Sequence, residues 1–156
     1  MKKVIYNLFL MMTMISFSSC LTSGLDDLPV YEEAEITSVS AVRYRYISDE
    51  ISPATGQNIV KEVNMTYTSE INTEAATVKI SVTTPENFPT SELNNLSTSA
   101  NLLVSVGLST AARLTATNDS PDLGKPGDWS KPNTYTVEAA SGKKKNWTIE
   151  IVSLKK

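Results

Sequence analysis

The sequence contains no histidine and only one cysteine among its 156 residues. Histidine is the most common general base and a common metal ligand, so its absence removes many catalytic and metal-binding arrangements. A single cysteine has no disulfide partner within the chain. Ser-His and Cys-His nucleophiles and zinc sites of His and Cys are excluded, and the enzymatic options narrow to paired carboxylates. We therefore predict a protein that is not an enzyme and has no cofactor and no bound metal.

The chain also lacks an excess of positive charge. Its formal net charge is −3, from 14 Lys and Arg against 17 Asp and Glu. The basic runs are short, and the longest covers residues 143–145. An acidic chain without a basic stripe is not expected to bind nucleic acid.

The first nineteen residues have the order of a secretory signal peptide. Lys2 and Lys3 give a positive start, residues 4–17 carry no charge, and the small residues Ser18 and Ser19 follow. The apolar stretch is shorter than the ~20 residues that a membrane-spanning helix needs. We assign residues 1–19 to the signal peptide, and the remaining 156 − 19 = 137 residues are enough for one domain.

The only cysteine, Cys20, comes directly after the small pair. This arrangement resembles a bacterial lipobox, in which the signal is cut before a cysteine that becomes acylated. Phe17 departs from the aliphatic residue that most lipoboxes have, and the alternative is an ordinary signal peptide with an incidental cysteine. Because two or more acyl chains hold a protein stably on a bilayer, we expect Cys20 to anchor the protein in a membrane.

Residues 20–34 contain several acids and few large apolar side chains, which is typical of an extended tether. An acidic stretch soon after the lipidated cysteine resembles the surface-export signal of Bacteroidetes lipoproteins. That resemblance implies a protein in the outer membrane, lipid-anchored and facing the cell exterior.

Apolar residues after position 35 recur at every second position, as in half-buried β-strands. A long first strand is expected over residues 35–47, and alternation continues in 63–68, 77–83, 101–108, 134–140 and 146–152. A tight hairpin is expected at 141–143, and one or two helical turns at 90–96. About seven short alternating strands predict an all-β fold, a single immunoglobulin-like β-sandwich of antiparallel strands over residues 35–156.

The last third of the chain resembles a known family. Residues 102–152, LLVSVGLSTAARLTATNDSPDLGKPGDWSKPNTYTVEAASGKKKNWTIEIV, contain a strand and small-residue turn, a loop with an aromatic and a proline, and a TYTV hairpin. This order is similar to the immunoglobulin-like domains of unknown function in Bacteroidetes lipoproteins, the DUF5018 type. The resemblance is good over residues 100–153 and general over 35–99. It implies association with outer-membrane systems that import glycans or peptides, and it brings no catalytic residues.

One loop holds the candidate binding residues Trp129, Asp119, Asp122 and Asp128. An exposed tryptophan could stack on a sugar, or it could fold back and close the end of the sandwich. Carboxylates in a Gly/Pro-rich loop could hold calcium, although the spacing is not that of an EF-hand and aspartates also favour turns.

Two functions follow from these observations. The first, whose nutrient-uptake role is what the family resemblance implies, is a non-catalytic surface lipoprotein that serves as an accessory component of a nutrient-uptake complex, docked to an outer-membrane TonB-dependent transporter and its capture lipoprotein. The alternative is a surface glycan-binding module with Trp129 at its site.

Overall fold

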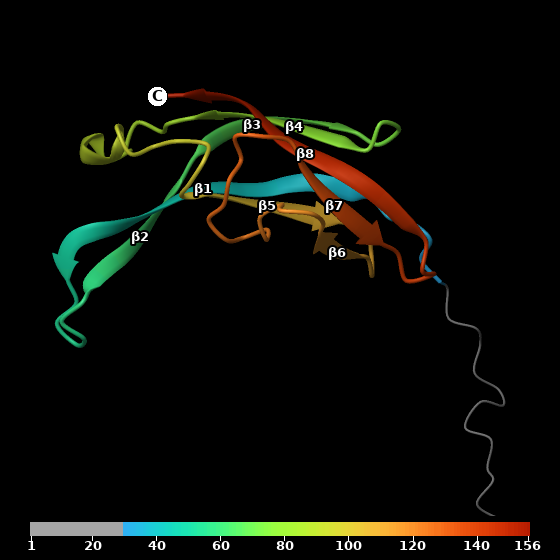
Figure 1. The fold of residues 1–156 in the computed structure, drawn as a ribbon, viewed down its shortest axis with the longest axis horizontal. Coiled ribbons are helices and arrows are strands. Elements are labelled where there is room, and N and C mark those ends of the chain that lie inside the picture. The colour runs from blue at the N-terminus through green and yellow to red at the C-terminus, as the bar shows by residue number, and fades with distance from the viewer. Residues whose placement is uncertain (1–29) are drawn as a thin grey trace, which may run out of the picture.

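The computed structural model describes residues 30–156, which form two β-sheets packed face to face (Figure 1). Within these residues there are eight strands and one short 3₁₀ helix. They are β1 (Ile36–Ile51), β2 (Asn58–Asn64), β3 (Thr66–Asn72), β4 (Thr77–Thr83), η2 (Thr90–Glu92), β5 (Leu102–Leu108), β6 (Arg113–Ala116), β7 (Asn133–Glu138) and β8 (Lys144–Lys155).

The strands are divided unequally between the sheets. One sheet has three strands in the order β2-β1-β5, and the other has five in the order β3-β4-β8-β7-β6. This arrangement confirms the predicted all-β sandwich. Two details differ from the prediction. There are eight strands in the described residues, not about seven, and β4 and β8 run parallel, not antiparallel. Hydrophobic alternation specifies which face of a strand is dry, but not the direction of its neighbour.

The core lies between the two sheets and is built from the predicted alternating positions. In β7, Asn133, Tyr135 and Val137 are buried, while the residues between them are partly exposed. In β8, Trp147 and Ile149 have no exposed surface, as the sequence predicts, and Ile151 packs partly exposed beside them. The facing sheet contributes the buried side chains Val42 and Tyr44 from β1.

The first strand is longer than predicted and forms an arm together with β2. Strand β1 continues past residue 47 to Ile51, and β2 pairs with it antiparallel from Asn58 to Asn64. We call residues 45–64 the hairpin arm. Figure 1 shows that the arm extends beyond the rest of the sandwich, at the end opposite to the point where the described chain begins.

The predicted single strand over residues 63–68 is in fact two strands in two sheets. The chain leaves the small sheet after Asn64 and enters the large sheet at Thr66. Met65 lies at the crossing, where it is buried and its backbone N–H donates to the carbonyl of Val42 over 2.9 Å. The alternation of apolar residues continues through the crossing, so the pattern alone shows one strand.

The end of the predicted tether packs on the sandwich. The carbonyl of Tyr31 accepts a hydrogen bond from the Ser141 N–H over 3.1 Å, and Ala34 is buried. The packed part of the chain therefore begins before Glu35. The predicted signal peptide and Cys20 lie outside the described residues.

Two smaller expectations concern turns and helices. Gly142 has a φ of 84° in the predicted hairpin turn, where its N–H donates to the carbonyl of Ala139. The helical expectation at residues 90–96 corresponds to η2 and the turn after it. No helix in the described part of the chain combines the length and apolar character needed to cross a bilayer.

Candidate functional site

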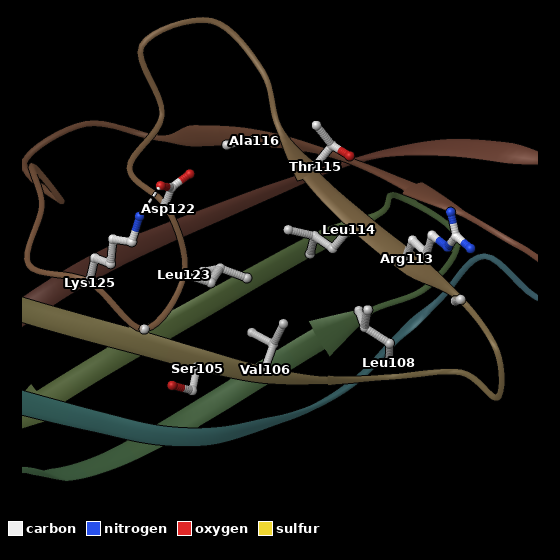
Figure 2. A pocket seen from close by; sticks show the side chains of 12 residues that line it. Ser105, Val106, Leu108, Arg113, Leu114, Thr115, Ala116, Asp122, Leu123 and Lys125 are labelled. Carbon is white, nitrogen blue, oxygen red and sulfur yellow. Dashed lines mark hydrogen bonds and ion pairs between the residues drawn. The ribbon is translucent and has the colours of Figure 1, made fainter.

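A groove of about 820 Å³ runs along one side of the sandwich between β5 and β6 (Figure 2). Each of these strands is the last in its sheet. The groove therefore lies where the two sheets end side by side. The loop that joins β6 to β7 closes it with Asp122, Leu123 and Gly124.

The groove is apolar along its strands and polar at its rim. Its apolar lining comes from both sheets and from the loop, namely Val106, Leu108, Ala112, Leu114, Ala116 and Leu123. Arg113, Asp122 and Lys125 supply charges, and Figure 2 shows Asp122 and Lys125 together on one side and Arg113 at the other end. Such a lining favours a ligand with both apolar and polar groups.

Strand β5 turns toward the groove backbone groups that have no partner among residues 30–156. Asn101 and Ser109, which flank β5, bond through the Asn101 carbonyl and the Ser109 N–H to the β1 side. The odd-numbered residues between them therefore also turn their backbone groups toward β1. Even-numbered residues point the other way, and the Val104 carbonyl accepts from the Gly124 N–H in the loop over 2.8 Å. Because backbone direction alternates along a strand, Val106 and Leu108 present their N–H and C=O groups to the groove.

Strand β6, on the opposite wall, also turns backbone groups toward the groove. The Thr117 N–H donates to the Thr134 carbonyl on the β7 side over 3.0 Å. By the same alternation, Leu114 and Ala116 direct their backbone groups into the groove. Within the part of the chain that the structure describes, the groove is thus bordered by two free strand edges, which is the geometry that binds an extended polypeptide.

The predicted aspartates do not come together. Asp122 pairs with Lys125 at the groove rim, with Oδ2 and Nζ 2.8 Å apart (Figure 2). Asp128 accepts hydrogen bonds from the hydroxyl and the backbone N–H of Ser130, and these bonds lower the pKa of its carboxyl. Asp119 is exposed. Within residues 30–156, no group of three Asp, Glu, His or Cys is placed to hold a metal ion, so the calcium alternative gains no support.

Trp129 takes the inward of the two positions that the sequence left open. It has no exposed surface, and its indole Nε1–H donates to the Leu102 carbonyl over 3.1 Å. Its ring stacks on Tyr135 with 6.5 Å between centroids. The side chain therefore closes the sandwich, which is the alternative that the sequence left open, and it cannot stack on a ligand.

The loop geometry explains why Trp129 faces inward. Gly127 passes so close to Pro121 that a Cβ at Gly127 would lie 2.1 Å from the Pro121 Cβ. Its N–H donates to the Leu102 carbonyl, and the Tyr135 hydroxyl donates to the Pro121 carbonyl over 2.8 Å. The loop is therefore folded back on itself and on β5, which carries Trp129 into the core.

Glu138 of β7 and Glu150 of β8 do not form a pair of carboxylates for acid/base chemistry. Glu138 lies opposite Lys144, and their charged groups are 3.2 Å apart. Glu150 is six residues further along β8 than Lys144, a separation of about 20 Å at 3.3 Å per residue. These two acids cannot act on one bond.

A second hollow, of about 620 Å³, lies between the hairpin arm and the segment around η2. Its lining includes Tyr46, a half-buried residue that packs against the core, together with Glu92 and Asn95. Tyr46 stacks on Tyr44, whose hydroxyl donates to Glu92 over 2.9 Å. Burial and then this carboxylate raise the pKa of Tyr44 to about 12.

Sequence reasoning missed both hollows for one physical reason. The groove joins β5 to β6 and the second hollow joins β1 to η2, so each depends on how separate segments pack. The four-residue strand β6 is short enough to leave no clear alternation. Only Asp122 among the predicted site residues lines the groove.

Comparison with known proteins gives two matches. The DUF5018-related family matches residues 36–150. A solved structure from Bacteroides fragilis, described as a "putative secreted protein", is 39% identical, with a TM-score of 0.70 over 82% of this chain and 100% of that chain. No curated protein matches. The likeness to a protein so described agrees with the export predicted from the first nineteen residues. The family match covers most of the sandwich, and the chain therefore belongs to the DUF5018-related family.

Proposed function

We propose that this protein is a non-catalytic lipoprotein, anchored through Cys20 in the outer membrane and facing the cell exterior. It acts as an accessory component of a nutrient-uptake complex that imports glycans or peptides. Its partners are a TonB-dependent transporter and the capture lipoprotein of that transporter. Its contribution is docking and presentation, without a chemical step.

The observation that carries this proposal is the groove between β5 and β6. Free backbone groups at Val106 and Leu108 on one wall and at Leu114 and Ala116 on the other suit a strand added from a partner protein. Main-chain hydrogen bonds supply affinity in such complexes, and alternate side chains supply selectivity. Leu114 and Leu123 would receive apolar side chains of the partner.

The absence of assembled reactive groups also supports a binding role. The sequence has no histidine, and the described residues hold no cluster of metal-ligating side chains. The carboxylates on β7 and β8 are about 20 Å apart. A protein with an open groove and these features is better suited to holding another molecule than to transforming it.

Co-purification from its own host tests the proposal. The tagged full chain, at native abundance, is isolated from detergent-solubilised membranes and its companions are identified by mass spectrometry. We expect a TonB-dependent transporter and its capture lipoprotein in comparable amounts. A protein that always elutes alone contradicts the proposal.

A matched pair of variants assigns the docking to the groove. In Ala116→Pro, the lost N–H is one that points into the groove, so strand addition is blocked without loss of a ladder bond. Val152→Lys changes an exposed residue of β8 that does not line the groove. We expect the first variant to lose the transporter and the second to retain it. Retention by both would place the docking elsewhere.

The second candidate function is glycan binding, at the hollow beside Tyr46 and not at Trp129. Here a half-exposed aromatic ring lies near Arg45, Glu92, Asn95 and polar backbone, a combination suited to a sugar ring and its hydroxyls. Affinity gel electrophoresis with host-derived glycans tests it. Retardation that is lost in Tyr46→Ala at an unchanged melting temperature would support binding at this hollow, and no retardation with any glycan would contradict it.

A further inference from the structure

The hairpin arm carries an exposed apolar patch on one face. Ile47, Ile51 and Val60 are 70%, 54% and 58% exposed, and they account for half of the six large hydrophobic side chains that are exposed in residues 30–156. Ile47 and Val60 lie directly opposite each other on β1 and β2. Ile51 lies opposite Asn58, which is on the same face of β2 as Val60. Apolar side chains gathered in this way on an exposed surface mark a contact site.

The outer edge of the arm is a strand that no other described segment pairs with. Strand β2 is the last strand of its sheet, with β1 on its inner side. The side to which each residue of β2 turns its backbone groups follows from Met65, whose N–H donates to the Val42 carbonyl on β1. Odd-numbered residues therefore face β1, and Asn58, Val60 and Glu62 turn their backbone N–H and C=O groups outward. An exposed edge with an adjoining apolar face invites pairing with another strand.

We propose that a second copy of this chain occupies this edge, with the two β2 strands antiparallel and Val60 opposite Val60 of the second copy. The two three-stranded sheets then form one continuous six-stranded sheet. The twofold axis passes beside Val60, so the same surface is used by both copies. This inference does not depend on the proposed function.

The charges on β2 select this register. A twofold pairing of β2 can be centred on Ile59, Val60, Lys61 or Glu62. Centring on Lys61 or Glu62 sets two like charges directly opposite each other, which destabilises a strand pair. Centring on Ile59 pairs only residues 58–60, whereas centring on Val60 pairs residues 58–62.

The Val60 register also joins the apolar patches. Ile47 and Val60 of one copy and the same two residues of the other form a row of four aliphatic side chains across the seam. Glu62 lies opposite Asn58 of the second copy and keeps its ion pair with Arg45, in which Glu62 Oε1 and Arg45 Nη2 are 2.6 Å apart. In this register no charged residue of β2 lies opposite a like charge.

The shape of the molecule allows two copies to meet at their β2 edges. The arm extends beyond the sandwich, and the described chain begins at the other end (Figure 1). The groove between β5 and β6 is lined by other strands, and none of its residues belongs to the arm. The dimer contact therefore leaves the groove between β5 and β6 open, but it uses Ile47 and Val60, which also line the second hollow beside Tyr46.

Mass measurement of the full-length protein, purified from membranes in detergent, tests the proposal. Sedimentation over a dilution series is expected to give a dimer for the unchanged chain. Val60→Lys is expected to weaken association at least about tenfold, because two ammonium groups would face each other across the seam. Val152→Lys, which changes an equally exposed valine on β8, is expected to remain dimeric. A monomeric unchanged chain, or a dimeric Val60→Lys variant, would overturn the inference.

Cysteine cross-linking tests the register independently. Val60→Cys places two thiols on opposing residues, so a short thiol cross-linker is expected to link the dimer. Asn64→Cys is the control, because in this register the two copies of position 64 are eight residues apart, or about 26 Å. The unchanged chain, with Cys20 alone, controls for links at that cysteine. Linking at position 64 but not at 60 would contradict the register.

Discussion

The indole Nε1–H of Trp147 donates to the backbone carbonyl of Ala34 over 3.0 Å, and both residues are buried. This bond attaches the segment before the first strand to β8, the central strand next to β4 and β7. Lys145 strengthens the same attachment, because its ammonium group is 2.8 Å from Glu35 Oε1. The chain that leads to the predicted anchor is therefore fixed to the sandwich by its own buried contact.

Trp147→Phe should loosen this attachment and lower the stability of the protein. The ring stays apolar, but the Ala34 carbonyl is left buried without a partner, which costs about 1–3 kcal/mol. We expect the melting temperature to fall by about 5 °C or more. Limited proteolysis should also cut residues 31–34 faster. An unchanged melting temperature and an unchanged cleavage rate would show that the bond does not hold the segment.

Trp129→Ala should damage folding before it affects any binding. The side chain is fully buried and large, and its removal leaves a cavity that costs about 3–5 kcal/mol. Lys131→Ala, an exposed neighbour in the same loop, should change the free energy of unfolding by less than about 0.5 kcal/mol. Chemical denaturation of the two variants checks this difference. A fully stable Trp129→Ala variant would contradict the buried position.

Tyr44 should make the protein less stable at high pH. Its folded pKa is raised to about 12 by burial and by the Glu92 carboxylate, against an ordinary value of 10. The folded state therefore holds a proton that the unfolded state loses between these values, and the free energy of unfolding falls as pH rises. Tyr44 contributes its full effect below pH 10 and loses it as pH rises through about 12.

The variant Tyr44→Phe isolates this effect from other groups that titrate at high pH. Burial also raises the pKa of Tyr135, so the unchanged protein should lose stability through both residues. Thermal unfolding between pH 9 and pH 12 should show a shallower fall for the variant than for the unchanged protein. Parallel curves for the two proteins would mean that the pKa of Tyr44 is not shifted.

A proline placed at two successive positions of β6 should lower stability to different extents. Thr115→Pro removes an N–H that points toward Thr136 of β7, so a ladder hydrogen bond is lost. Ala116→Pro removes an N–H that points into the groove, where the described residues offer it no partner. We expect the first variant to lower the melting temperature clearly and the second to lower it little. The reverse order would mean that the edge of β6 is assigned incorrectly.

Sequence alternation predicted the faces of the strands but not their partners. Tyr44, Val137 and Trp147 are buried where the period of two places them. The parallel pairing of Thr77 with Thr148 joins segments far apart in the chain, and nothing local encodes it. Met65 shows the same limit, since a strand can change sheets without a break in its alternation.

The candidate site was less predictable because it depends on loop packing. The direction of Trp129 follows from the contact between Gly127 and Pro121, which a spacing pattern does not contain. The groove depends on β5 and β6 each ending a sheet. Composition indicated only that the loop would be a turn-rich connection, and that part of the prediction is correct.

Metabolic labelling with a clickable palmitate analogue, followed by separation of membranes, tests the central claim most directly. The unchanged protein should carry the label, fractionate with the outer membrane and be cut by protease added to intact cells. Cys20→Ser should carry no label and leave the outer membrane. The double variant Cys20→Ser, Ser23→Cys, which moves the only thiol away from the small pair, should also be unlabelled. Label or outer-membrane residence that survives in Cys20→Ser would contradict a lipid anchor at this cysteine.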